Sequence, residues 1–200
     1  TAQHKAVADD LLLKVSQATS GFVGKDYLRE LTKFITVTLG VRYALISECA
    51  NENKTKVRTI SYVDRGETLE NIEYDLAGTP CEIVMRGVDY FCPQNLDQKF
   101  PKEEHLDSYI SVPIYSPSTG EIIGHIAALD TGPMQEDQNQ TAILKIFAAR
   151  AGSEIERICN EEKLLELLRS DNIQLQKKLK ESEERYRDLF EEAPFAYVHE

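Results

Sequence analysis

The stretch that most constrains the fold is residues 109–130, YISVPIYSPSTGEIIGHIAALD. In its first half, Ile110, Val112 and Ile114 alternate with Ser, Pro and Tyr, which predicts a strand with one buried face. Residues 116–120 are dense in turn formers and predict a reversal of the chain. Residues 122–129 are almost continuously apolar, which is typical of a strand covered on both faces. We therefore expect two long, mutually paired strands at the centre of a sheet.

Shorter patterns precede this hairpin. Helical spacing of apolar residues predicts helices over residues 4–18 and 26–39, the second ending at Gly40. Residues 41–49 and 57–63 read as a second hairpin, and the polar residues 67–73 as a loop. Residues 89–93 indicate a short extended segment, and residues 96–106 a charged, loosely helical one.

Residues 79–82, Thr-Pro-Cys-Glu, have the form of a capping box with Pro at the first helical position. They predict a short helix over residues 80–86, with Thr79 and Glu82 bonding each other's backbone amides. Cys81 would then lie near free amides at the positive helix end, which lowers the pKa of a thiol and can also receive an anionic ligand group. The alternative is that Cys81 is a small buried apolar residue.

From residue 137 the helical pattern continues almost to the C-terminal end. Apolar positions over residues 151–165 and 168–189 are spaced alternately by four and three, which indicates two heptad runs joined by a stammer. Asn172 falls at an a position, where Asn favours parallel two-stranded pairing. A parallel homodimer is the prediction, and a solvated single helix is the alternative. The residues expected to make dimer or signalling contacts are Ile155, Ile158, Leu165, Leu168, Asn172, Leu175 and Leu179.

Composition excludes several partners. A formal net charge of −11 argues against nucleic acid and anionic membranes. No stretch approaches the roughly 18 apolar residues of a membrane span. The four cysteines form no C-x-x-C pair, so neither a zinc site nor a disulfide scaffold is indicated. The chain begins without Met inside a helical pattern and shows no signal peptide, so we interpret it as part of a larger cytoplasmic protein.

Together these patterns resemble a GAF domain over residues 20–158. The resemblance is carried by the S-V-P-I strand, the I-I-G-H-I-A-A-L-D strand, the D-L-A-G-T-P-C-E-I-V segment and the closing helix A-I-L-K-I-F-A-A-R-A-G-S-E-I-E-R. Among GAF domains, the chain most resembles those of bacterial sensor histidine kinases, cyclases and enhancer-binding activators. The resemblance implies an α+β fold with a central antiparallel sheet of five or six strands, with terminal helices on one face and a ligand pocket on the other. The tail S-E-E-R-Y-R-D-L-F-E-E-A-P resembles the start of a PAS domain.

The resemblance also allows particular ligands to be tested. Cyclic-nucleotide GAF domains have an Asn-Lys pair and a Phe after the last strand, where this chain has Asp130-Thr131 and Met134. Only the acidic pair at residues 136–137 remains, so cyclic nucleotide binding is not supported.

Bilin-binding relatives attach their chromophore through Cys in a Cys-His or Asp-x-Cys-Phe context. Here Cys81 precedes Glu and Cys92 precedes Pro, so bilin is not supported either. Free methionine sulfoxide reductases place a catalytic Cys just before the V-P strand, and residues 105–108 contain none. The enzymatic alternative is therefore disfavoured, and the cofactor stays unknown.

Aromatic and polar residues on the predicted strands and loops supply a candidate pocket. His125 lies inside a buried strand, where a hydrogen-bonded structural role is the default, and two distant histidines are weak evidence for a metal or haem. No metal site is predicted. The candidate ligand-binding residues are Tyr62, Thr79, Cys81, Phe91, Phe100, His105, Tyr109, Ser111 and His125.

The domain prediction is an N-terminal helix (1–19), a GAF domain (20–158), a coiled-coil linker (159–190) and the start of a truncated PAS domain (191–200). We predict a regulatory module of a signal-transduction protein, such as a two-component system. It would bind a small molecule, or respond to redox state, and transmit the change through a parallel coiled coil. A ligand-free dimerisation spacer is the alternative.

Overall fold

The computed structural model describes residues 21–135 and 138–192. Two compact units make up the chain, with their boundary between Arg157 and Ile158. We call the described residues up to Arg157 the N-terminal unit and those from Ile158 the C-terminal unit. The helix predicted over residues 4–18 lies outside the described residues, as does the predicted PAS start beyond residue 192.

The N-terminal unit contains a seven-stranded antiparallel sheet in the order β3-β2-β1-β7-β6-β5, with β4 also paired to β2. The predicted hairpin is confirmed: β6 and β7 pair antiparallel, and β7 lies in the centre between β6 and β1. The strands are β1 (Tyr43–Cys49), β2 (Lys56–Asp64), β3 (Glu67–Thr68), β4 (Glu73–Asp75), β5 (Tyr90–Cys92), β6 (Ser108–Tyr115) and β7 (Ile122–Asp130).

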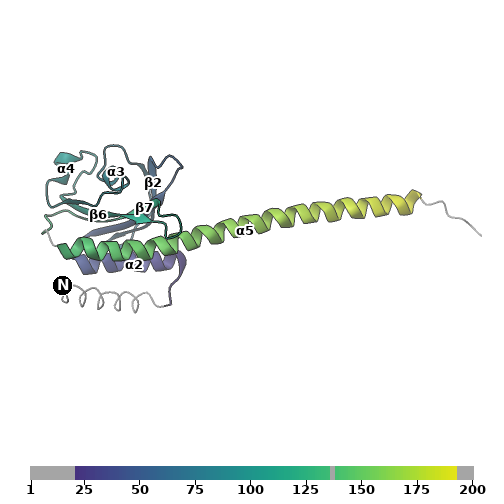
Figure 1. The fold of residues 1–200 in the computed structure, drawn as a ribbon, viewed down its shortest axis with the longest axis horizontal. Helices are drawn as coiled ribbons and strands as arrows, with labels where there is room; N and C mark the ends of the chain where they lie inside the picture. Colours follow the sequence, from purple (N-terminus) through teal and green to yellow (C-terminus); the bar gives the residue numbers. More distant parts are fainter. Residues whose placement is uncertain (1–20, 136–137, 193–200) are drawn as a thin grey trace, which may run out of the picture. The chain divides into compact units, whose positions relative to one another are not determined.

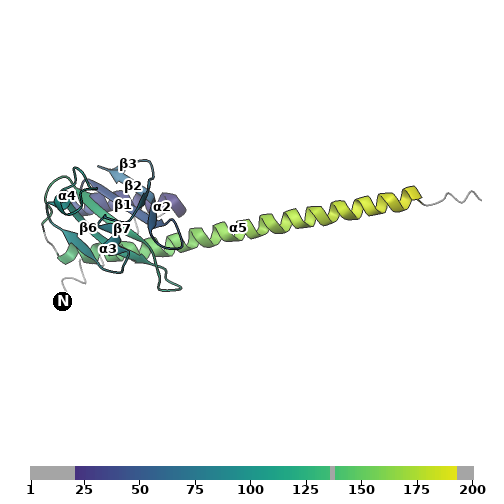
Figure 2. The same ribbon diagram turned by 90° about the horizontal axis from the view of Figure 1, so that it is seen from above.

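Helices cover both faces of this sheet (Figure 1). On one face lie α2 (Gly24–Leu39) and the first turns of α5 (Gln138–Glu192). The two helices contact each other through the rings of Phe34 and Phe147, which meet edge to face with their centroids 5.9 Å apart. On the other lie the short helices α3 (Cys81–Val84) and α4 (Leu96–Lys99), which Figure 2 shows in front of the strands. The predicted α+β class and the separation of the two faces are confirmed.

Local backbone chemistry determines where α2 ends, whereas a tertiary contact determines where it begins. Gly40 takes the left-handed conformation (φ 65°) that ends a helix without a Cβ penalty, as predicted. The helix begins at Gly24, two residues before the predicted start. The Glu154 carboxylate of α5 accepts a hydrogen bond from the Gly24 amide, so a distant residue supplies the missing N-cap.

The prediction that β6 has one buried and one exposed face is wrong. Every residue from Ser108 to Ile114 is buried, and only Tyr115 is exposed. The reason is the close approach of α5: a Cβ on Gly152 would lie 2.5 Å from the Tyr115 carbonyl oxygen. Since Gly has no Cβ, the helix backbone can pack directly on the end of the strand and cover its second face.

Three local predictions also need correction. Residues 67–73 are not wholly loop, because β3 and the first residue of β4 lie there and pair with β2. In residues 96–106 only α4 is helical. The helix expected over residues 80–86 is limited to the four residues of α3. Each segment is short and packs against the sheet, so tertiary contacts decide its conformation.

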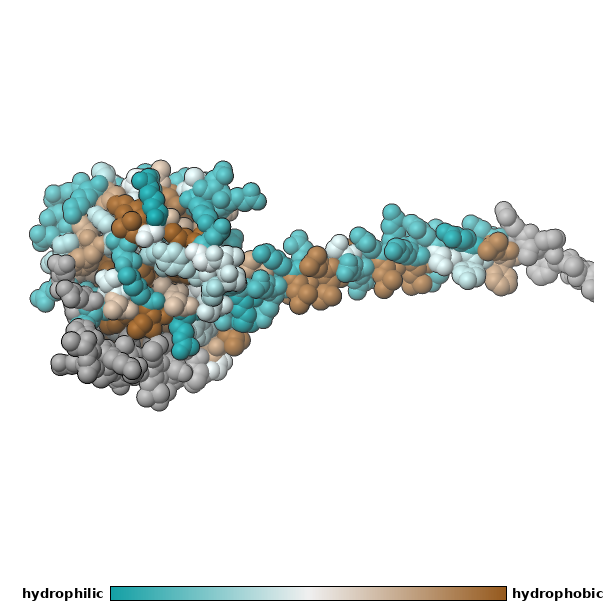
Figure 3. Space-filling model, viewed as in Figure 1, coloured by the Kyte–Doolittle hydropathy of each residue, from teal (hydrophilic) through white to brown (hydrophobic). Residues whose placement is uncertain are grey.

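The C-terminal unit consists of the part of α5 after Arg157. Its leucines are exposed, among them Leu165 (54%), Leu175 (68%) and Leu179 (60%). Figure 3 shows hydrophobic patches in brown along this part of α5, between hydrophilic ones. In the described part of the chain, no helix is long and apolar enough to span a membrane.

Candidate functional site

A cavity of about 450 Å³ lies in the N-terminal unit, on the sheet face that carries α3. Strands β1, β2, β4, β6 and β7 contribute to it, together with α3 and the segment after α4. Its lining residues are Leu45, Tyr62, Ile72, Tyr74, Asp75, Thr79, Cys81, Lys102, Glu103, Leu106, Tyr109 and Leu129. Its volume lies within the range of small-molecule sites, and it combines apolar walls with a few polar groups.

A buried chain of five hydrogen-bonded side chains reaches the wall of this cavity. Ser47 Oγ lies 2.6 Å from Nδ1 of His125, and Nε2 of His125 lies 3.5 Å from the Tyr74 hydroxyl. That hydroxyl lies 3.4 Å from Cys81 Sγ, which in turn lies 3.3 Å from the Tyr109 hydroxyl. The chain therefore links the sheet interior to three residues that line the cavity.

Burial keeps every titratable member of this chain uncharged at neutral pH. It lowers the pKa of His125 to about 3 and raises the pKa of Tyr74 and of Tyr109 well above their usual values. It also raises the pKa of Cys81, although hydrogen bonds from both tyrosines oppose that shift. Because the charged forms are desolvated, the site presents neutral hydroxyl, thiol and imidazole groups.

The capping box predicted around Cys81 is absent. The Thr79 hydroxyl donates to the Leu76 carbonyl oxygen at 2.7 Å, and the Glu82 carboxylate accepts from the Gly78 amide at 3.2 Å. Cys81 is 4% exposed and its pKa is raised, so it is a buried thiol rather than an activated thiolate. The backbone amides of Thr79 and Glu82 are already bonded to carbonyl oxygens, so an anion site at this helix start loses its support.

Four of the nine predicted ligand-binding residues line the cavity: Tyr62, Thr79, Cys81 and Tyr109. They come from three separate segments, and the fold brings them together. The remaining five are located elsewhere, namely Phe91, Phe100, His105, Ser111 and His125.

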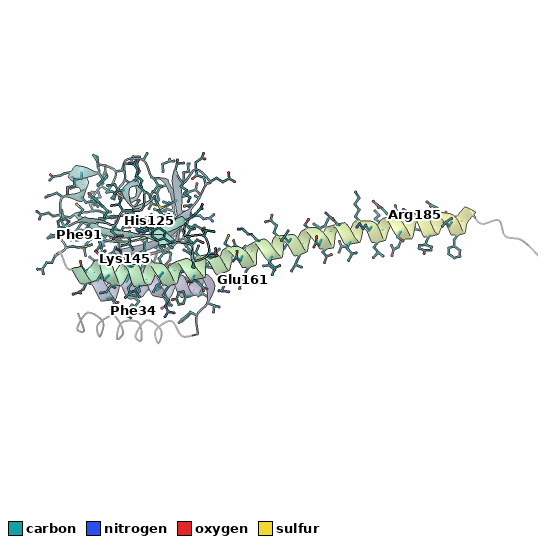
Figure 4. All side chains as sticks on the ribbon, viewed as in Figure 1. Phe34, Phe91, His125, Lys145, Glu161 and Arg185 are labelled. Atoms are coloured by element: carbon teal, nitrogen blue, oxygen red, sulfur yellow. The ribbon has the colours of Figure 1, made fainter. Side chains whose placement is uncertain are left out.

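These five residues lie in different surroundings. His125 is fully buried behind the cavity wall, and Ser111 donates to the Ile126 carbonyl oxygen at 2.7 Å. Phe91 lies in β5 near one end of the sheet, away from His125 in the interior (Figure 4). Phe100 packs on the core from outside, and His105 is exposed in a loop with φ 69°.

No sequence pattern pointed to several of the other lining residues. Lys102 and Glu103 belong to a charged loop whose neighbours are solvated, and Asp75 ends a three-residue strand. No periodicity distinguishes these residues from surface charges. Tyr74 also lies in a segment too short for a pattern, although it bonds both Cys81 and His125.

A larger groove of about 870 Å³ lies beside α5, lined in part by Val88, Pro113 and Ala148. Its charged lining residues, Lys145 and Asp89, pair with each other at 2.6 Å. We assign the candidate site to the smaller cavity because the buried polar chain ends there. The described residues contain no group of three or more His, Cys, Asp or Glu placed to hold a metal ion.

The predicted dimer residues fall into two groups. Ile155 is 6% exposed in the N-terminal unit and belongs to its core, and Ile158 is half-buried. The others are exposed in the C-terminal unit: Leu165, Leu168, Asn172, Leu175 and Leu179.

Comparison with known proteins identifies the architecture. No family model and no curated protein matches the sequence. Solved structures do match: the GAF domain of an Acinetobacter phosphoenolpyruvate-protein phosphotransferase has a TM-score of 0.63 at 13% identity, over 77% of this chain and 96% of that domain. The fold is the GAF fold.

Two further solved structures are similar to this chain. The nlh2 GAF domain of A. aeolicus in an inactive state has a TM-score of 0.59 at 15% identity, over 76% of this chain and 98% of that one. The chromophore-binding domain of Stigmatella aurantiaca phytochrome P1 has a TM-score of 0.57 at 11% identity, over 76% of this chain and 59% of that one. At these identities the similarity concerns the fold alone.

Proposed function

We propose that the chain is a regulatory sensor module that binds a small molecule in the cavity of its N-terminal unit. The conformational change that ligand binding causes would pass along α5 to a parallel dimeric coiled coil, and from there to PAS and output domains of a cytoplasmic signal-transduction protein. The observation that carries the proposal is the continuity of α5, one helix from Gln138 to Glu192. The same helix supplies core residues of the N-terminal unit and the exposed leucines of the C-terminal unit.

Ligand binding is supported by the cavity itself. About 450 Å³ is enough for a small organic molecule, which argues against the alternative of a spacer filled by its own side chains. The similarity to a phytochrome chromophore-binding domain supports a binding role for this fold. The acidic, thiol-containing chain has four free cysteines, which suits a reducing, cytoplasmic location.

Dimerisation is supported by the exposed apolar stripe. A single solvated helix would leave Leu165, Leu168, Leu175 and Leu179 in water, each more than half exposed. Fully burying a leucine side chain contributes about 1.5–3 kcal/mol, so pairing of four leucines is strongly favoured over exposure. Asn172 at an a position selects the parallel two-stranded arrangement.

Transmission is supported by the joint between α5 and the sheet. Gly152 packs against the Tyr115 carbonyl at the end of β6, and β6 also supplies Tyr109 to the cavity wall. A shift of β6 on ligand binding would therefore press directly on the helix. A small rotation or translation of a packed helix is a known way to bias a downstream two-state element.

A regulatory rather than catalytic role is supported by the state of Cys81. The free methionine sulfoxide reductase alternative needs an accessible thiolate, whereas Cys81 is buried and its pKa is raised. The same facts argue against direct redox sensing at this residue. Turnover of a small oxidised substrate that disappears in Cys81→Ser would overturn this assignment.

Native mass spectrometry of protein purified from its source organism tests ligand binding and stoichiometry together. We expect a dimer that carries a co-purified small molecule. Parallel pairing is tested with Leu175→Cys in a Cys159→Ser background, which should form a disulfide between copies because d positions face each other. Lys177→Cys, at an outward f position, is the matched control and should not. A monomer, or equal cross-linking of both variants, would contradict the proposal.

A further inference from the structure

Glu103 contributes a carboxylate to the wall of the cavity, next to Lys102 in the sequence. It is half-buried, and burial raises its pKa while the charge of Lys102 opposes that shift. Across residues 21–135 and 138–192, its carboxylate makes no hydrogen bond or ion pair. The Lys102 ammonium instead donates to the Ala77 carbonyl oxygen at 2.6 Å. The cavity wall therefore contains a carboxylate that has no ion-pair partner among the described residues.

Several other polar groups of the cavity already have partners within the protein. The hydroxyls of Tyr74 and Tyr109 are bonded to the thiol of Cys81, and the Thr79 hydroxyl donates to a backbone carbonyl. Asp75 pairs at 3.6 Å with a lysine of β2. A ligand that offered more hydrogen-bond acceptors would find few free donors, and an anion would meet two carboxylates. The one cation among the lining residues, Lys102, is bonded to a backbone carbonyl oxygen and makes no ion pair with either carboxylate.

The aromatic lining suits the same chemistry. Glu103 lines the cavity together with Tyr62 and Tyr74, and its charge contributes to the raised pKa of both tyrosines after the larger effect of burial. A cation near this carboxylate can also contact ring faces, which attract positive charge. Leu45, Leu106 and other apolar side chains supply the rest of the surface.

We propose that the cavity binds a small organic amine whose ammonium group pairs with Glu103 and whose apolar body packs on the leucine and tyrosine side chains. The inference rests on the proposed function, since it names the ligand class of the same cavity. The ammonium group would form an ion pair with the Glu103 carboxylate, and the apolar body would displace water from the hydrophobic wall.

The test is isothermal titration of the 200-residue chain at pH 7 with three probes of equal shape. Phenethylammonium is a cation, 2-phenylethanol is neutral and phenylacetate is an anion. We expect the cation to bind at least about tenfold more tightly than the other two, which is the effect of one charge-assisted hydrogen bond. Glu103→Gln should remove that preference. Glu104→Gln, which removes an exposed neighbouring carboxylate, should leave it unchanged.

A second variant separates this inference from the proposed function. Leu106→Trp fills the cavity and should abolish binding of phenethylammonium. If Leu106→Trp abolishes binding but Glu103→Gln does not, the cavity binds ligand and the amine assignment is wrong. The amine assignment is equally wrong if the alcohol or the acid binds as tightly as the amine. Failure of all three probes, or amine binding that survives both variants, also overturns the inference, whereas the co-purified ligand tests the function independently.

Discussion

Acid should destabilise the N-terminal unit through His125, which the fold keeps neutral. Burial lowers its pKa from 6.5 to about 3, and the groups bonded to its ring, Ser47 and Tyr74, carry no charge. Between those pH values only the unfolded chain takes up the proton, so the free energy of unfolding falls as pH falls. A drop from pH 7.5 to 5.5 crosses the unfolded pKa and should remove about 1.4 kcal/mol, and each further unit down to the native pKa about as much again.

Urea unfolding at both pH values measures this loss. Near-ultraviolet circular dichroism is the suitable signal, because the chain has nine tyrosines and no tryptophan. The asparagine in His125→Asn cannot take up the proton, but its amide can still bond the Ser47 hydroxyl. This variant should therefore not lose stability between pH 7.5 and 5.5, even if it is less stable than the wild type at both pH values. His105→Asn is the control: it replaces an exposed histidine at φ 69°, a conformation that Asn tolerates, and should retain the full loss. Equal losses in wild type and His125→Asn would refute the neutral buried imidazole.

Three further predictions concern the helix joint, the coil and the cavity. Gly152→Ala places a Cβ 2.5 Å from the Tyr115 carbonyl oxygen and should lower the free energy of unfolding by about 1–2 kcal/mol, after the gain in helix propensity. Gly132→Ala is the control: its Cβ would have no atom within 4 Å, so the free energy of unfolding should change by no more than about 0.5 kcal/mol in the same urea assay. Asn172→Leu should strengthen pairing, seen as a higher thermal midpoint by circular dichroism, and alter the ligand-dependent output of the full-length protein; an unchanged output would contradict a signalling role for this region. Burial raises the pKa of Glu103, so the wild type loses stability as pH rises through the pKa of the folded state. Glu103→Gln should therefore have a higher thermal midpoint than the wild type at pH 7 but not at pH 4. Equal thermal midpoints at pH 7 would count against a desolvated carboxylate.

Features that depend on neighbours in the chain were predictable from the sequence. The hairpin of β6 and β7 follows from apolar alternation on either side of a turn-rich segment, and Gly40 ends α2 because only the local backbone decides that stop. The long C-terminal helix follows from the helical spacing of its apolar residues. Four cavity residues could also be named, since aromatic and polar side chains at strand and helix starts suggested them.

Contacts between distant segments determined everything else. The sequence alone specified which segments form strands and helices, because hydrophobic period and turn chemistry act over a few residues. Only the tertiary structure decided that α5 covers the second face of β6, that Glu154 caps α2, and that Glu103 and Tyr62 line the same cavity. These outcomes depend on which elements pack on the sheet and how closely, and burial then changes the chemistry of residues such as His125 and Cys81. No local pattern encodes desolvation, since it arises only when segments far apart in the sequence exclude water together.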